Sequence, residues 1–92
     1  MGADLYWKKT PKPKDEEFTG LKMSTWGFLS ELWEIEDRRD FDEKELNRTN
    51  LPQLEAVYLT AKTSSNKELA DDIKSLIDGI KKHQSITLNV RH

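Results

Sequence analysis

The 92-residue sequence has no cysteine, only four glycines and no long hydrophobic run, and each absence excludes a class of protein. Without cysteine there is no disulfide framework, no thiolate zinc site and no cysteine nucleophile. The glycines are scattered along the chain, so they form no phosphate-binding loop. Because no apolar leader or spanning segment is present, we expect no signal peptide, no membrane span and a cytoplasmic location.

The composition is that of a small folded protein with a heavily charged surface. Hydrophobic residues and charged residues each make up 35% of the chain, and eight aromatic residues (three Trp, three Phe, two Tyr) argue against disorder. The length allows one domain with a thin core, so residues 1–92 are expected to form a single domain. The formal net charge of −2 lacks the basic excess that is usual in nucleic-acid-binding proteins.

Alternating apolar and polar residues predict a β-strand at each end of the chain, over residues 3–9 and 85–91. The apolar faces of these strands consist of Leu5, Trp7, Ile86, Leu88 and Val90. A two-stranded sheet is only marginally stable alone, so we expect the two strands to pair with each other beneath helices.

Three segments between these strands have apolar residues at helical spacing, and they predict helices over residues 25–36, 51–62 and 66–83. The expected N-cap residues are Ser24 or Thr25, Asn50, and Ser65. The third segment has the clearest pattern. A glycine inside it, Gly79, is unfavourable in a helix by about 1 kcal/mol relative to alanine, and it predicts close packing of another backbone there.

The remaining segments predict two loops. Residues 10–20 are rich in proline and lysine, and residues 37–50 are acidic, with one helical turn expected near residues 42–46. The expected fold class is α+β, with two terminal β-strands pairing beneath three α-helices in the order β-α-α-α-β. The expected core consists of Leu5, Trp7, Leu29, Leu69, Ile73, Leu76, Ile77, Ile86 and Leu88.

Residue types that catalyse reactions or bind metals are present without the spacing that such sites need. His83 is expected at the end of the third helix, where a cation complements the helix dipole, and His92 is the last residue. Asp40 and Asp42 lack the glycine and the further ligands of a calcium loop. We therefore expect a protein that is not an enzyme and that uses no cofactor and no metal.

Two features predict a protein partner. The apolar residues of the first helix cover about half of its circumference, which is wide for a core stripe, so its tryptophans face either the core or a partner. The segment from Glu34 to Glu45 carries seven carboxylates and three basic residues, which is either a solvated loop or a surface that imitates DNA phosphates. The predicted partner-binding residues are Trp26, Trp33, Glu34, Asp37, Asp40, Asp42 and Glu43.

A lysine cluster near the N-terminus gives the alternative function, nucleic-acid binding. Basic residues beside Tyr6 and Trp7 are able to grip a single strand, although lysines also blunt an exposed strand edge. The cluster consists of Lys8, Lys9, Lys12 and Lys14. The strand over residues 85–91 has no proline and one charge, so its edge is poorly protected and predicts a homodimer.

Two stretches of the sequence resemble small proteins encoded by bacteriophages. The opening Met1-Gly2-Ala3-Asp4-Leu5-Tyr6 and the later Ser24-Thr25-Trp26-Gly27-Phe28-Leu29 match proteins that begin Met-Gly-x-Asp-Leu-Tyr and then carry a tryptophan-rich stretch. The present sequence has one tryptophan there, where the family has several in a row. The resemblance implies a phage accessory role, such as an anti-defence protein that binds a host protein in the host cytoplasm, and it supplies no functional residues.

Overall fold

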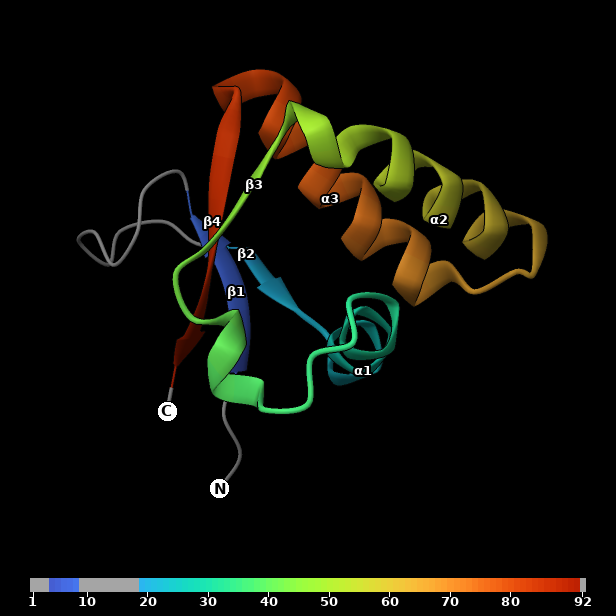
Figure 1. Cartoon of the computed structure of the whole chain (residues 1–92). Coiled ribbons are helices and arrows are strands. Elements are labelled where there is room, and N and C mark those ends of the chain that lie inside the picture. Colours follow the sequence, from blue (N-terminus) through green and yellow to red (C-terminus); the bar gives the residue numbers. More distant parts are fainter. Residues whose placement is uncertain (1–3, 9–18, 92) are drawn as a thin grey trace.

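Four strands form one antiparallel sheet in the computed structural model, which describes residues 4–8 and 19–91 (Figure 1). The strands are β1 (Asp4–Lys8), β2 (Thr19–Leu21), β3 (Lys44–Asn47) and β4 (Ser85–Arg91). The two terminal strands pair with each other, as the sequence predicts, and place Leu5 opposite Val90 and Trp7 opposite Leu88. The α+β class is therefore confirmed, and the strand order is β2-β1-β4-β3.

The two additional strands fall in segments that the sequence assigns to loops, so the element order departs from β-α-α-α-β. β2 ends the expected loop over residues 10–20, of which residues 10–18 lie outside the described part of the chain. The helical turn expected near residues 42–46 is wrong, because β3 occupies that stretch and pairs Leu46 with Ile86. The helical turn lies earlier, in η1 (Arg38–Phe41), and a second one, η2 (Arg48–Asn50), follows β3.

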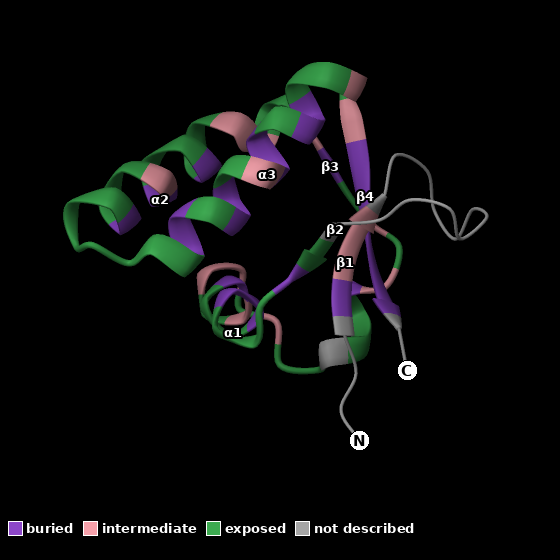
Figure 2. Ribbon diagram, turned by 180° about the vertical axis from the view of Figure 1, so that it is seen from behind, coloured by how far each residue is buried: buried purple, intermediate pink, exposed green. Residues whose placement is uncertain are grey.

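Three helices lie on one side of the sheet (Figure 1). They are α1 (Met23–Leu32), α2 (Leu51–Thr63) and α3 (Lys67–His83). α3 lies against the sheet and contacts α1, whereas α2 packs on α3 farther from the strands. Figure 2 shows the consequence: buried positions occur where these elements face one another, and the outer side of α2 is exposed.

Two helix boundaries differ from the predictions, and in each case local backbone geometry gives the reason. α1 ends at Leu32 rather than near residue 36, because Glu34 adopts a positive φ of 54°, which a continuing helix does not allow. The N-cap residue of α3 is Asn66, whose side chain accepts a hydrogen bond from the Leu69 N–H at 3.3 Å. The predicted cap, Ser65, instead has a φ of 60° in the turn between α2 and α3.

The predicted core is confirmed, with Trp7 half-buried and the eight other residues at most 5% exposed. The predicted core did not include Trp26 or Phe41, and the sequence left the helix tryptophans open between core and partner. Trp26 is 1% exposed and makes an edge-to-face contact with the buried ring of Phe41, with ring centroids 6.1 Å apart. Further buried residues outside the prediction include Leu21, Leu46, Leu54 and Val57.

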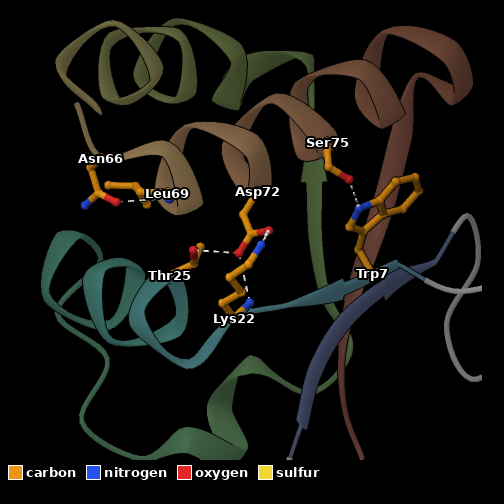
Figure 3. Close-up of polar contacts among 7 residues, drawn as sticks. All are labelled: Trp7, Lys22, Thr25, Asn66, Leu69, Asp72 and Ser75. Carbon is orange, nitrogen blue, oxygen red and sulfur yellow. Dashed lines mark hydrogen bonds and ion pairs between the residues drawn. The ribbon is translucent and has the colours of Figure 1, made fainter. Parts of the chain in front are cut away.

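Trp7 fastens β1 to α3 through two contacts. Its indole N–H donates a hydrogen bond to the Ser75 hydroxyl at 2.8 Å (Figure 3). One turn further along α3, its ring lies so close to Gly79 that a Cβ there would be 2.8 Å from the nearest ring carbon. The close approach predicted at Gly79 is therefore present, but its partner is a side-chain ring rather than a backbone.

Asp72 fastens α1 to α3 in a similar way. The Asp72 side chain is buried on α3, and its carboxylate accepts hydrogen bonds from the Lys22 backbone N–H at 2.8 Å and the Thr25 hydroxyl at 2.7 Å (Figure 3). Lys22 is the N-cap residue of α1, and its side chain makes no capping hydrogen bond, which differs from the predicted cap at Ser24 or Thr25. A carboxylate on α3 therefore accepts the hydrogen bond of a backbone N–H that has no partner within α1, and its negative charge lies at the positive end of the helix dipole.

Candidate protein-interaction surface

The acidic segment predicted to meet a partner forms the exposed connection between α1 and β3. We call residues 34–45 the acidic connector. With three basic residues and seven carboxylates it has a formal charge of 3 − 7 = −4. The exposed carboxylates of this connector are Glu34, Glu36, Asp37, Asp40, Glu43 and Glu45. The structure thus brings most of the predicted acidic residues together on one solvent-facing segment.

The acidic connector is anchored to the fold in its middle. Phe41 is fully buried, and its ring contacts both Trp26 and Trp33. The next residue, Asp42, accepts a hydrogen bond from the Val90 backbone N–H at 3.0 Å, beyond the last paired residues of β3 and β4. The Asp42 carboxylate, predicted to bind a partner, therefore already serves as an acceptor for the end of β4.

Asp37 and Arg39 form a local ion pair within the acidic connector. The Arg39 guanidinium lies 2.9 Å from one Asp37 carboxylate oxygen, and the Arg39 backbone N–H donates to the other at 2.9 Å. The side-chain hydrogen bond from Arg39, followed by the backbone one, lowers the pKa of Asp37 below its ordinary value of 3.8. The same pair raises the pKa of Arg39. Asp37 is therefore ionised at neutral pH and caps the start of η1.

The two predicted partner-binding tryptophans lie in different environments. Trp26 belongs to the core, so it is not on the described surface. Trp33 is half-buried at the end of α1, with its ring centroid 6.3 Å from that of Phe41 and 5.2 Å from the Lys44 ammonium. Its indole N–H donates to the Gln53 side-chain oxygen at 2.7 Å. Trp33 therefore joins the end of α1 to β3 and to the start of α2.

The exposed side of α1 carries apolar residues that the sequence did not assign to a site. Met23 is 52% exposed and Phe28 is 36% exposed, and the exposed Gly27 lies between them. For Phe28 the signal was present in the broad apolar distribution of the predicted helix, because residues outside the core-facing stripe have to point outward, whereas Met23 precedes the predicted helix. The acidic connector begins two residues after the helix ends.

A hollow of about 330 Å³ lies where α2 turns into α3. The Lys62 ammonium lies over the Tyr58 ring, 5.5 Å from its centroid, and Asp71 sits on the α3 side. The polar residues that line it are Tyr58, Lys62, Ser65, Lys67 and Asp71. Because charges of both signs are mixed at an open site, the hollow indicates no particular ligand class.

The other predicted sites receive no geometric support from the described residues. Of the predicted lysine cluster, Lys9, Lys12 and Lys14 lie outside the described residues, as does the side chain of Lys8. Within residues 4–8 and 19–91, no group of three His, Cys, Asp or Glu residues is placed to hold a metal ion. No helix in this described part is long and apolar enough to cross a membrane.

Comparisons of the chain with protein families, with curated protein sequences and with solved structures found no match. The resemblance to bacteriophage accessory proteins therefore stays a prediction.

Proposed function

We propose that this protein is a small non-enzymatic interaction module, which uses the acidic connector to bind a protein partner with a basic surface. The observation behind the proposal is that the exposed carboxylates of the connector are held in a fixed position. Six exposed carboxylates lie on a segment that is fixed to the core by Phe41 and to β4 by Asp42. A surface that is ordered before binding loses less conformational entropy when a partner arrives.

The anchoring favours a binding role over a merely solvated loop. Burial of Phe41 and the hydrogen bond from Val90 to Asp42 stabilise the fold, and they also hold the carboxylates of the connector in a fixed arrangement, which a recognition surface needs. A fixed acidic surface also accelerates encounter with a basic partner and repels acidic ones. If the resemblance to bacteriophage proteins holds, the partner is a host protein, and a basic surface that normally contacts DNA has the matching chemistry.

The proposal is tested with a synthetic probe of defined chemistry. The probe is an amphipathic helical peptide with leucine on one face and lysine on the other, and its counterpart carries glutamate in place of lysine. We expect the lysine peptide to bind the full chain and the glutamate peptide not to bind. Equal binding of both peptides would refute the proposal. A single-stranded oligonucleotide tests the alternative function, and tight, steeply salt-dependent binding would favour the lysine cluster.

Two matched variants locate the binding surface. The connector variant is Glu34→Gln, Glu36→Gln and Asp40→Asn. The helix variant removes the same number of charges from exposed carboxylates of α3, at Glu68→Gln, Asp71→Asn and Asp78→Asn. The connector variant is expected to bind the lysine peptide more weakly, with the loss shrinking as salt rises, while the helix variant binds like the wild type. Circular dichroism checks that both variants are folded.

The predicted homodimer stays open to test, but the structure weakens the argument from an unprotected edge of the last strand. β4 is not an outer strand, because it lies between β1 and β3; β3 pairs with residues 85–88, and beyond them the Val90 N–H donates to Asp42. The outer strands are β2 and β3, and β3 is short and carries Lys44 and Glu45, which disfavour edge pairing. Light scattering across a tenfold dilution series measures whether the chain is a monomer.

A further inference from the structure

One side of α1 exposes a continuous strip of residues. Met23, Gly27 and Glu31 follow one another at intervals of four, so they lie in a row along the helix. Ser24 and Phe28 form the adjacent row. The opposite side of the helix faces the core through Thr25, Trp26 and Leu29. α1 therefore has a second face with two exposed apolar side chains and a glycine between them.

Nothing within the described structure explains the glycine in this strip. None of the described glycines has a positive φ, so the backbone at position 27 does not need glycine. A Cβ at position 27 would meet no described atom within 4 Å, so packing does not need it either. Glycine in a helix interior is nevertheless unfavourable by about 1 kcal/mol relative to alanine. Gly79 shows the contrast, because the Trp7 ring occupies the space beside it.

We infer that the exposed face of α1 is the docking site for a basic amphipathic helix of the partner. This inference rests on the proposed function and names the shape of the partner. The partner helix passes over Gly27, where the missing side chain allows the two backbones to approach closely. Its apolar side chains contact Met23 and Phe28, and its basic side chains lie toward Glu31 and the acidic connector. This arrangement has an apolar centre and a charged rim, as stable interfaces do.

The negative charge in and beyond the strip favours a basic partner over a second copy of the chain. Glu31 lies in the strip itself, and the acidic connector with its formal charge of −4 begins just beyond the end of α1. A second copy would present the same strip, which contains Glu31 and no basic residue, so it offers these charges no complement. A basic helix gains from the same charges, so the apolar strip and its acidic surroundings favour one occupant.

The test adds side-chain bulk at position 27 in the full chain. Gly27→Ala and Gly27→Leu fill the proposed contact point, and Ala56→Leu adds bulk at an exposed position of α2 as the matched control. The probe is the lysine–leucine peptide described above, titrated into ¹⁵N-labelled protein. We expect peptide-induced shifts along the exposed face of α1, about tenfold weaker binding by Gly27→Leu, and wild-type affinity for Ala56→Leu. The Gly27 variants should be at least as stable as the wild type, so a binding loss is not misfolding.

The outcomes separate this inference from the proposed function. If the connector variant weakens binding while Gly27→Leu binds like the wild type, the docking site on α1 is refuted and the proposed function stands. If the glutamate peptide binds as well as the lysine peptide, both are refuted. A wild-type dimer that Gly27→Leu dissociates would replace the basic helix with a second copy as the occupant of this face.

Discussion

The two glycines inside helices predict opposite responses to the same substitution. Gly27→Ala removes a helix-destabilising residue at an exposed position where the added methyl group meets nothing. The expected gain in the free energy of unfolding is about 1 kcal/mol. For a domain of this size, that gain corresponds to a rise in the melting temperature of roughly 4–8 °C.

Gly79→Ala brings the same intrinsic gain but places a methyl group 2.8 Å from the nearest carbon of the Trp7 ring. The ring cannot simply slide away, because its indole N–H is bonded to Ser75 one turn earlier on the same helix. Overpacking of this kind costs about 1–3 kcal/mol. After subtraction of the helix-propensity gain of about 1 kcal/mol, we expect a net destabilisation of up to roughly 2 kcal/mol.

Urea unfolding followed by circular dichroism compares both variants with the wild type in one experiment. The variant with the higher midpoint should be Gly27→Ala and the one with the lower midpoint Gly79→Ala. A Gly79→Ala protein that is more stable than the wild type would refute the contact between Trp7 and α3. A Gly27→Ala protein that is less stable would show that glycine at position 27 serves the folded chain itself and not a partner.

Three further predictions concern the core, the attachment of α1 and an exposed ion pair. Ile73→Ala should lower the free energy of unfolding by about 2–5 kcal/mol because the side chain is fully buried; a loss below 1 kcal/mol in urea unfolding would contradict the core assignment. Asp72→Ala should cost roughly 2–5 kcal/mol because the Lys22 backbone N–H, the Lys22 ammonium and the Thr25 hydroxyl lose a charged acceptor, and Asp72→Asn, which keeps one acceptor oxygen, should cost less in the same assay. The lowered pKa of Asp37 means that the ion pair contributes stability above pH 3.8 and loses it as the pH falls further; Arg39→Ala should move the NMR titration midpoint of Asp37 upward, and an unchanged midpoint would exclude the pair.

Long periodic segments were predictable from the sequence because their side chains alternate between a buried face and an exposed face. The terminal strands and α3 repeat apolar residues at their own periods, and all were found close to the predicted boundaries. β2 and β3 were missed because they have three and four residues and a single buried apolar side chain each, Leu21 and Leu46. A strand of that kind is specified by the partner it pairs with, and that partner is far away in sequence.

The candidate site was predictable in its charge but not in its geometry. The acidic composition of residues 34–45 is visible in the sequence, and the structure places most of it in solvent. The residues next to each carboxylate in the sequence do not show which carboxylates form hydrogen bonds that stabilise the fold. Asp42 acts on β4, 48 positions away. Asp72 gave one available signal, because it falls three residues after Leu69 and next to Ile73, within the apolar stripe of α3.

The attachment of α1 connects stability with the proposed binding. α1 is held to the rest of the fold by its inner side, where Thr25, Trp26 and Leu29 are buried, and by the Asp72 carboxylate at its start. A helix of ten residues is too short to be stable alone, so these contacts decide how well it is ordered. A partner helix on the exposed face would add a second layer over α1. Binding there should therefore protect the α1 backbone amides from hydrogen exchange more than those of α2, whose outer side stays exposed.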